Sequence, residues 1–232
     1  MREICIVGGD ARMEYAAQVL QAAGYCVTRT ALADAQEHAA KGRILIGGGL
    51  PEMLGGFDYL KDEAFLYDNA RLTAEGALVL LGSSTDGALF GADVAVIGMG
   101  RIAECLCPLL RAVGACVTVY ARRPEVLSRA RAMGAQAVRF LGALPAVAAQ
   151  HQIVCNTVPH VLCDRALLSC ARRDVLLLEL ASAPGGFDRA AAEALGLQMI
   201  NGQGLPGKYA PRAAGQRIAA FVLDAILEEG KV

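Results

Sequence analysis

The sequence is poor in the residues that mark several classes of protein. It has 232 residues, no tryptophan, and only 5% aromatic and 19% charged residues. A formal net charge of −1 gives no electrostatic basis for binding nucleic acid or an anionic membrane. No uninterrupted apolar run reaches the length of a membrane span. Residues 1–7 predict a strand rather than a signal peptide, because Glu3 and Asp10 flank only a short apolar run.

Metal-binding patterns are also missing from the sequence. The eight cysteines form no C-x-x-C motif, and the three histidines, His38, His151 and His160, do not stand at ligand spacing from a cysteine pair. We therefore expect no metal site. Because most of the cysteines lie within apolar segments, we expect buried, reduced thiols in a cytoplasmic protein.

Apolar segments of two alternating kinds make up most of the chain. With 55% hydrophobic residues, it can bury a substantial core. Short apolar runs alternate with helical ones, which is typical of a parallel sheet covered by helices. The expected strands are 4–7, 25–29, 43–46, 94–97, 116–120, 137–140, 153–157, 175–180 and 197–200. The expected helices are 13–20, 102–113, 124–133, 162–170, 189–195 and 213–227. The sequence thus predicts the α/β fold class, with a doubly wound parallel sheet in its second half.

A glycine turn after the first strand of that sheet is the most specific motif. Gly98-Met-Gly100-Arg-Ile-Ala103 has the G-x-G-x-x-A spacing of dinucleotide-binding turns. The first glycine permits the tight turn, the second lets backbone approach a pyrophosphate, and the alanine allows close helix packing. The helix N-terminus then faces the phosphates. We expect Gly98, Gly100, Arg101 and Ile102 to contact a dinucleotide cofactor.

The residues after the next strand indicate which dinucleotide binds. An acidic residue there would bind the ribose 2′-hydroxyl of NAD, but the sequence has Arg122 and Arg123. Guanidinium groups suit a 2′-phosphate, so the pair favours NADP as the cofactor. The alternative is a solvated surface pair that binds no ligand.

Further candidates stand at other strand ends, where ligands bind in open α/β sheets. Asn156 and Thr157 either touch the nicotinamide ribose or satisfy loop backbone, and Ser182 is placed among the cofactor contacts. Glu179 ends an apolar strand, and we expect it to order the neighbouring loop; the alternative is a role as the base of the site. His160 has no visible partner, so no catalytic acid or base is assigned.

The chain before the glycine turn predicts a second, smaller Rossmann-like lobe. Its first turn carries Asp10, which would repel a phosphate and is expected to cap the following helix. Thr73 is expected to be the N-cap of a connecting helix. The predicted divisions are an N-terminal α/β lobe that shapes a substrate cleft (1–72), the connecting helix (73–90), a Rossmann NADP-binding domain (91–210) and a C-terminal helix (211–232).

Four residues are candidates for binding a carboxylate substrate. Arg12, Lys208 and Arg212 are cations that would converge on a carboxylate if two lobes close over a cleft. The helix end at Thr73 would lie nearby. For each cation, the alternative is an ordinary surface charge.

Several longer motifs resemble those of the A subunit of dipicolinate synthase. They cover nearly the whole chain and are most specific toward its C-terminal end, where glycines and prolines recur in unusual combination. The matching segments are Gly8-Gly-Asp-Ala-Arg12, Thr73-Ala-Glu-Gly76, Val96-Ile-Gly-Met-Gly-Arg101, Asn156-Thr-Val-Pro159, Leu180-Ala-Ser-Ala-Pro-Gly-Gly186 with Asp188, and Gly204-Leu-Pro-Gly-Lys-Tyr-Ala-Pro211 with Ala214-Gly-Gln216.

This resemblance implies a sporulation enzyme of the mother-cell cytoplasm that acts with the flavoprotein-like B subunit of dipicolinate synthase. The pair would convert dihydrodipicolinate, or its hydroxy-tetrahydro precursor, to dipicolinate, with NADP as the hydride acceptor. We also expect a homo-oligomer. One alternative is a non-catalytic nucleotide-binding subunit, because no general base is evident. Another is a reductase resembling shikimate dehydrogenase, which shares the Asn-Thr-x-Pro strand end, although no lysine–aspartate pair is clearly placed for that chemistry.

Overall fold

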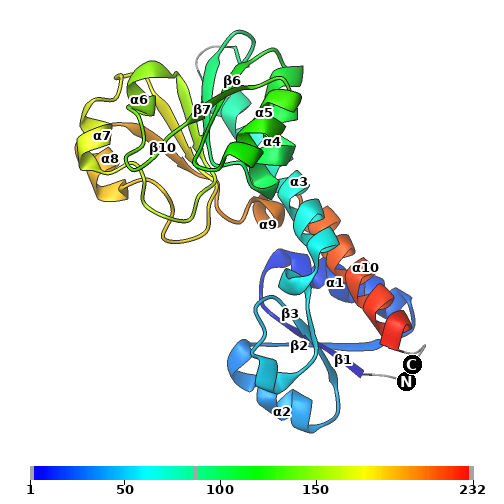
Figure 1. Ribbon diagram of the computed structural model, residues 1–232. Helices are drawn as coiled ribbons and strands as arrows, with labels where there is room; N and C mark the ends of the chain where they lie inside the picture. The colour runs from blue at the N-terminus through cyan, green and yellow to red at the C-terminus, as the bar shows by residue number, and fades with distance from the viewer. Residues whose placement is uncertain (1–2, 86–87, 230–232) are drawn as a thin grey trace. The chain divides into compact units, whose positions relative to one another are not determined.

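The computed structural model describes residues 3–85 and 88–229, and the chain divides into two compact units (Figure 1). The first unit combines Met1–Leu72 with Pro206–Val232, and the second comprises Thr73–Leu205. The C-terminal helix, expected from the sequence as a segment of its own, therefore belongs to the first unit by its contacts. Each unit is built on one sheet whose described strand pairs are all parallel.

A four-stranded sheet of order β2-β1-β3-β4 forms the centre of the first unit. Its strands are β1 (Glu3–Val7), β2 (Cys26–Thr30), β3 (Ile44–Gly47) and β4 (Phe57–Asp58). Its helices are α1 (Ala11–Ala22), α2 (Ala35–Ala40), α10 (Pro211–Glu229) and three short 3-10 helices, Leu32–Asp34, Glu52–Leu54 and Tyr59–Lys61. The chain order reverses between β1 and β3, and such a switch point leaves space for a ligand at the strand ends.

The second unit has a six-stranded sheet of order β10-β9-β8-β5-β6-β7. Its strands are β5 (Asp93–Ile97), β6 (Cys116–Ala121), β7 (Gln136–Arg139), β8 (Ile153–Asn156), β9 (Leu176–Glu179) and β10 (Gln198–Asn201). Its helices are α4 (Arg101–Ala112), α5 (Pro124–Ala132), α6 (Val147–Gln150), α7 (Arg165–Ser169) and α8 (Arg189–Ala194). The predicted fold class is confirmed, because this is the doubly wound order of a Rossmann sheet.

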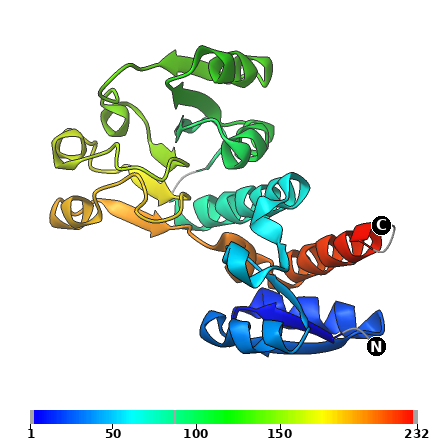
Figure 2. The same cartoon turned by 60° about the horizontal axis from the view of Figure 1, so that its bottom comes forward.

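Both faces of the second sheet are covered by helices (Figures 1 and 2). Val94 and Val96 of β5 pack with residues of α4 and α5 on one face. Ala95 and Ile97 pack with residues of α6, α7 and α8 on the other. All four side chains have no exposed surface, which explains why the strand reads as a continuous apolar run rather than an alternating one.

Helix α3 (Glu63–Ser84) corrects one prediction. Thr73 was expected to cap a helix starting there, but it lies inside α3 and is only 5% exposed. Instead, Asp62 accepts a hydrogen bond from the Phe65 N–H (2.6 Å) at the start of the helix. Phe65 is buried in the core of the first unit. No glycine or proline follows until Gly76, so nothing stops the helix before Thr73.

Several short elements were not predicted from the sequence, because each is too short for a periodic pattern. They are β4, α2, α6 and α9 (Leu205–Tyr209). Within the described residues, no helix combines the length and apolar character needed to cross a membrane.

Helix α10 packs closely against α1 in the first unit (Figures 1 and 2). A Cβ added at Gly215 would overlap the Arg12 carbonyl oxygen, and it would lie 2.7 Å from the Tyr15 Cβ. The absence of a side chain at Gly215 therefore lets the two helices approach each other. This contact explains why the C-terminal helix completes the first core, where Ile218 and Val222 are fully buried.

Candidate nucleotide-binding site

The glycine turn lies at the switch point of the second sheet, where β5 has β6 on one side and β8 on the other. Gly98 adopts a φ of +96°, which favours glycine. A Cβ there would lie 2.5 Å from the Thr157 Oγ1 and 2.8 Å from the Val158 Cγ2. Backbone conformation and packing therefore both require glycine at this position.

Gly100 is the N-cap residue of α4. Because glycine has no side chain, no N-cap side chain occupies this end of the helix. A Cβ added to Gly100 would meet no described atom within 4 Å, so the backbone is open to an approaching group. The first N–H groups of a helix have no partner within the helix and carry the positive end of its dipole. The start of α4, at Arg101 and Ile102, therefore fits the phosphates of a dinucleotide.

A cavity of about 260 Å³ adjoins this turn. Its lining residues come from the ends of β5, β6, β7 and β8 and from α5. They are Gly98, Met99, Gly100, Tyr120, Ala121, Arg122, Arg123, Val126, Phe140, Val158 and Leu162. The Tyr120 hydroxyl is hydrogen-bonded to the Nε2 of buried His151 (2.8 Å), which holds this wall in place. Apolar walls with two arginines fit an aromatic base that carries an anionic group nearby.

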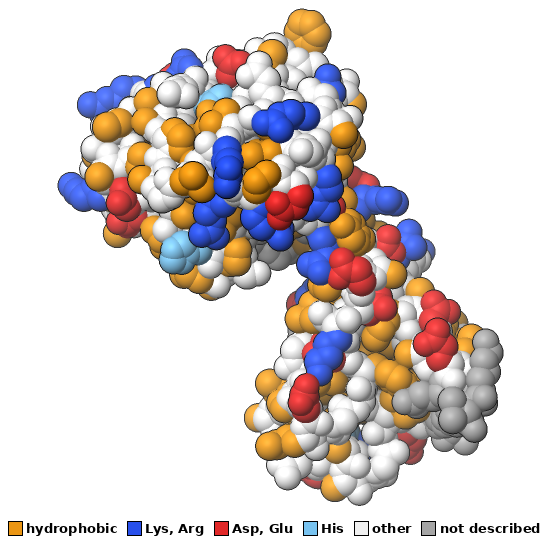
Figure 3. Space-filling view, in the orientation of Figure 1, with side chains coloured by type: hydrophobic (Ala, Val, Ile, Leu, Met, Phe, Trp, Pro, Cys, Tyr) orange, Lys and Arg blue, Asp and Glu red, His pale blue; other side chains and the backbone are white. Residues whose placement is uncertain are grey.

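The arginines at this cavity are exposed. Arg123 lies 3.5 Å from Glu125, and the side chains of both are more than 60% exposed, so the pair is loose. Arg139, at the end of β7, donates from its Nε to the Arg122 carbonyl oxygen (3.1 Å). In Figure 3, basic side chains gather among hydrophobic ones on the visible face of this unit. No role was predicted for Arg139 or Phe140, although both end a strand predicted from the sequence.

Asn156 and Thr157 follow β8 and bond to neighbouring backbone. Asn156 is fully buried, and its side-chain amide bonds the Val158 carbonyl (2.9 Å) and accepts from the Val158 N–H (3.2 Å). The Thr157 hydroxyl donates to the Ile97 carbonyl (2.8 Å). These contacts show Asn156 ordering loop backbone. A cofactor contact of Asn156 or of the half-buried Thr157 stays a prediction.

Glu179, at the end of β9, is 1% exposed and accepts four hydrogen bonds. The donors are Asn156 Nδ2 (2.7 Å), Ala181 N (3.0 Å), Gly186 N (2.7 Å) and Phe187 N (3.3 Å). Every partner donates, so the carboxylate is used as an acceptor throughout. These contacts agree with the expectation that Glu179 orders the neighbouring loop. They give no support to its alternative role as the base of the site.

The loop that Glu179 holds carries Ser182 at its surface. The Ser182 carbonyl accepts from the Gly185 N–H (2.9 Å), and the Ala183–Pro184 peptide bond in this loop is cis. The side chain is exposed, so its predicted cofactor contact stays a prediction. His160 is also exposed.

In the first unit, Asp10 and Arg12 form a forked ion pair. Asp10 caps α1 by accepting from the Arg12 N–H (2.9 Å), as predicted. The Arg12 guanidinium donates from Nε and Nη2 to the two Asp10 oxygens (3.0 and 2.7 Å). These hydrogen bonds from Arg12 lower the pKa of Asp10. The substrate-binding candidate Arg12 is thus already engaged by a carboxylate of its own chain.

The other cations predicted to bind substrate are less engaged. Lys208 and Arg212 are exposed and form no ion pair among the described residues. Gly207, next to Lys208, has its Cβ position 3.5 Å from the Arg12 Nε, so α9 reaches the Arg12 side chain. Thr73 is buried within α3 rather than at a helix end. Contact of these residues with a substrate stays a prediction.

Tyr59 was not predicted as a site residue. It directly follows β4, at the carboxyl end of that strand in the first sheet. It is 4% exposed, and its ring occupies the place that a Cβ of Gly48 would take, 2.7 Å from its hydroxyl oxygen. Burial raises the pKa of Tyr59, so the phenol stays protonated. The glycine run at 47–49 was the signal, because a bulky ring needs such a gap.

Comparison with known proteins shows which family the chain is related to. No protein-family model matches it. The A subunit of dipicolinate synthase from Bacillus subtilis (strain 168) is 37% identical over 177 residues, which make up 74% of this chain and 58% of that protein. The crystal structure of dipicolinate synthase, A chain, from Bacillus subtilis has a TM-score of 0.83 at 24% identity, covering 98% of this chain and 96% of that one. The chain is a relative of the dipicolinate synthase A subunit.

This relationship confirms the resemblance seen in the sequence motifs. The aligned part spans less than two thirds of the curated relative. The fold alone is shared more widely. The apo-structure of D-lactate dehydrogenase from Escherichia coli has a TM-score of 0.68 at 13% identity, covering 98% of this chain and 97% of that one. The fold is thus that of the dipicolinate synthase A subunit, and D-lactate dehydrogenase shares it.

Replacing Glu179 with Gln tests whether its carboxylate holds the loop. One accepting oxygen becomes an NH₂ group that faces N–H donors, so we expect the free energy of unfolding to fall by about 2–3 kcal/mol. Urea denaturation measures the loss. The matched control is Glu193→Gln, since Glu193 is exposed on α8. Equal effects of the two substitutions would contradict the assigned role.

Replacing Asp10 with Asn tests the ion pair with Arg12. Asn still caps a helix well, so the substitution removes the charge rather than the cap. Because Arg12 lowers the pKa of Asp10 in the folded state, the charged carboxylate stabilises the fold above its ordinary pKa of 3.8, and this contribution is lost as the pH falls through the lowered value.

We expect wild type to exceed Asp10→Asn in stability by about 0.5–1 kcal/mol near neutral pH. The difference should vanish at the acid end of a pH series of urea denaturations. Asp164→Asn is the control, because Asp164 caps α7 through the Leu167 N–H (2.9 Å) without an ion pair among the described residues. A difference that does not change with pH would exclude the charge as its source.

Proposed function

We propose that the chain is an NADP-dependent oxidoreductase subunit that converts dihydrodipicolinate, or its hydroxy-tetrahydro precursor, to dipicolinate together with the flavoprotein-like B subunit of dipicolinate synthase. The observation that carries the cofactor assignment is the open backbone at Gly100 and the start of α4, beside a cavity bordered by Arg122 and Arg123. The similarity to the dipicolinate synthase A subunit supports the substrate assignment. Activity during sporulation, in the mother-cell cytoplasm, and assembly into a homo-oligomer belong to the same proposal.

Different residues around the turn would bind different parts of the cofactor. Gly100, Arg101 and Ile102 would receive the pyrophosphate at the N-terminus of α4. Phe140 and Val158 would pack against the adenine, since both line the cavity. NADP, when bound, supplies the hydride acceptor for oxidation of the substrate ring. The chain's own contribution is to orient the donor carbon and to bind the charged ends of both molecules.

The proposed substrate is a small dicarboxylate, so it needs cationic partners. Lys208 and Arg212 are exposed and free of ion pairs within the described part of the chain, so they can accept a carboxylate without displacing another. Arg12 is held by both oxygens of Asp10 and would contribute through its remaining N–H groups.

A non-catalytic role in the complex is the second candidate. It is favoured by the contacts of Glu179, whose carboxylate is buried, accepts four hydrogen bonds from its own chain and does not line the cavity. In that case the B subunit would supply the chemistry, and this chain would hold the nucleotide.

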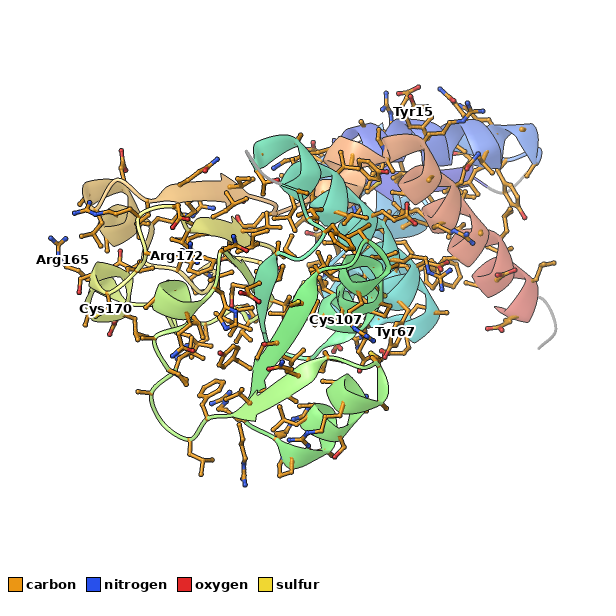
Figure 4. All side chains as sticks on the ribbon, turned by 90° about the horizontal axis from the view of Figure 1, so that it is seen from above. Tyr15, Tyr67, Cys107, Arg165, Cys170 and Arg172 are labelled. Carbon is orange, nitrogen blue, oxygen red and sulfur yellow. The ribbon has the colours of Figure 1, made fainter. Side chains whose placement is uncertain are left out.

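Cofactor preference is tested by isothermal titration. Wild type should bind NADP⁺ more tightly than NAD⁺, and Arg122→Ala/Arg123→Ala should weaken NADP⁺ by about 10- to 100-fold while leaving NAD⁺ nearly unchanged. The control is Arg172→Ala/Arg173→Ala, another arginine pair of this unit, which precedes β9 and does not line the cavity; Arg172 is labelled in Figure 4. Equal or tighter binding of NAD⁺ to wild type would contradict the proposal that Arg122 and Arg123 select NADP.

The reaction is tested by following NADPH formation from dihydrodipicolinate, with the chain alone and with the B subunit. NADPH formed by the isolated chain would rule out the non-catalytic role, and none in either arm would refute the proposed reaction. Lys208→Gln/Arg212→Gln should raise KM about tenfold with a smaller change in kcat, because binding charges are lost. The control is Arg217→Gln, which lies on the same helix as Arg212 and pairs with Asp68 (3.4 Å).

A further inference from the structure

We propose that Arg139, at the end of strand β7, is a third specificity-determining residue for the cofactor, and that it binds the phosphate monoester on the adenosine ribose beside Arg122 and Arg123. This inference rests on the proposed NADP function and names a residue for which the sequence motifs give no role. Its basis is the hydrogen bond from Arg139, at the end of β7, to the carbonyl of Arg122, which follows β6.

Pairing of β6 with β7 brings Arg139 to the rim of the cavity. Arg139 stands opposite Ala121 in the strand register, and the following residue, Phe140, donates from its N–H to the Ala121 carbonyl (3.2 Å). Ala121 and Phe140 both line the cavity, and Arg122 follows Ala121 directly. The position of Arg139 beside Arg122 is therefore fixed by the sheet itself.

The side chain of Arg139 is held at one atom and free at others. Its Nε donates to the Arg122 carbonyl oxygen (3.1 Å), which restrains the guanidinium next to Arg122. Within the described residues, its two Nη groups make no hydrogen bond or ion pair. A guanidinium with two free Nη groups presents a planar fork that suits phosphate oxygens.

The charges at the rim match a phosphate monoester in number. Arg122, Arg123 and Arg139 carry three positive charges, and Glu125 supplies one negative charge through its loose contact with Arg123, which leaves an excess of two. A phosphate monoester carries a charge of about −1.5 to −2 near neutral pH. The ribose diol of NAD has no charge to balance this excess.

Five arginines outside the rim are engaged by carboxylates at clearly shorter distances than Arg123 is by Glu125. The pairs are Arg12–Asp10 (2.7 Å), Arg29–Glu14 (2.6 Å), Arg43–Glu3 (2.6 Å), Arg129–Glu104 (2.9 Å) and Arg172–Asp174 (2.6 Å). Among the described residues at the rim, only Arg123 has a carboxylate partner, and that contact is longer than these five.

The test compares two probes that differ only by the phosphate, 2′,5′-ADP and 5′-AMP, by isothermal titration. Arg139→Gln removes the charge, but its amide can still donate to the Arg122 carbonyl, so a structural role would be preserved. We expect this variant to bind 2′,5′-ADP about tenfold more weakly and 5′-AMP within about twofold of wild type. Affinity of the variant for 2′,5′-ADP should also fall less steeply with added salt, since one charge contact is gone.

The control is Arg131→Gln. Arg131 is an exposed arginine that also donates to a backbone carbonyl, but it stands near the end of α5 and bonds Ala137 (3.4 Å) rather than Arg122. Unchanged discrimination in Arg139→Gln, with wild type still preferring 2′,5′-ADP, would overturn the role of Arg139 and leave the NADP assignment intact. Equal affinity of wild type for both probes would refute the NADP assignment and this inference together.

Discussion

The buried carboxylate of Glu179 is the interaction on which the ligand-facing edge of the second sheet depends. Its hydrogen bond from Asn156 holds the amide that fixes Val158, and its bond from the Gly186 N–H holds the loop after β9. The Gly186 carbonyl in turn accepts from the Leu162 N–H (2.9 Å). Val158 and Leu162 are walls of the cavity beside the glycine turn. A buried carboxylate, satisfied by three backbone N–H groups and the Asn156 amide, therefore sets the shape of a surface that it never reaches.

The same carboxylate explains why the loop is rich in glycine. Gly185 has a φ of +84°, and a Cβ there would lie 2.7 Å from the Glu179 Oε2. A Cβ at Gly186 would overlap the Asn156 amide. The sequence alone indicates a turn and a carboxylate that needs a partner. It does not indicate that the turn is wrapped around that carboxylate, because the partners are brought together by two different strands.

Buried strands and the glycine turn could be predicted from the sequence because each depends on a short run of residues. Helix starts and ion pairs depend on what lies outside the run. Thr73 has the composition of a helix cap, yet burial of Phe65 in a core places it within a continuing helix. Asp10 was recognised as a cap and Arg12 as a ligand-binding cation, but their mutual engagement required the geometry of the first turn of α1. Arg139 was missed because no motif covers the third strand.

Charge compensation distinguishes the two candidate regions physically. In the first unit, Arg12 is pre-oriented by Asp10, which lowers the entropy lost on binding but also neutralises much of its attraction for an anion. At the cavity of the second unit, the arginines keep their attraction but remain exposed and loosely held. A carboxylate that binds near Arg12 must therefore gain its affinity from Lys208, Arg212 or another donor, whereas a phosphate at the cavity rim gains it from the arginines directly. The first arrangement favours selection of an anion by shape, and the second favours selection by charge.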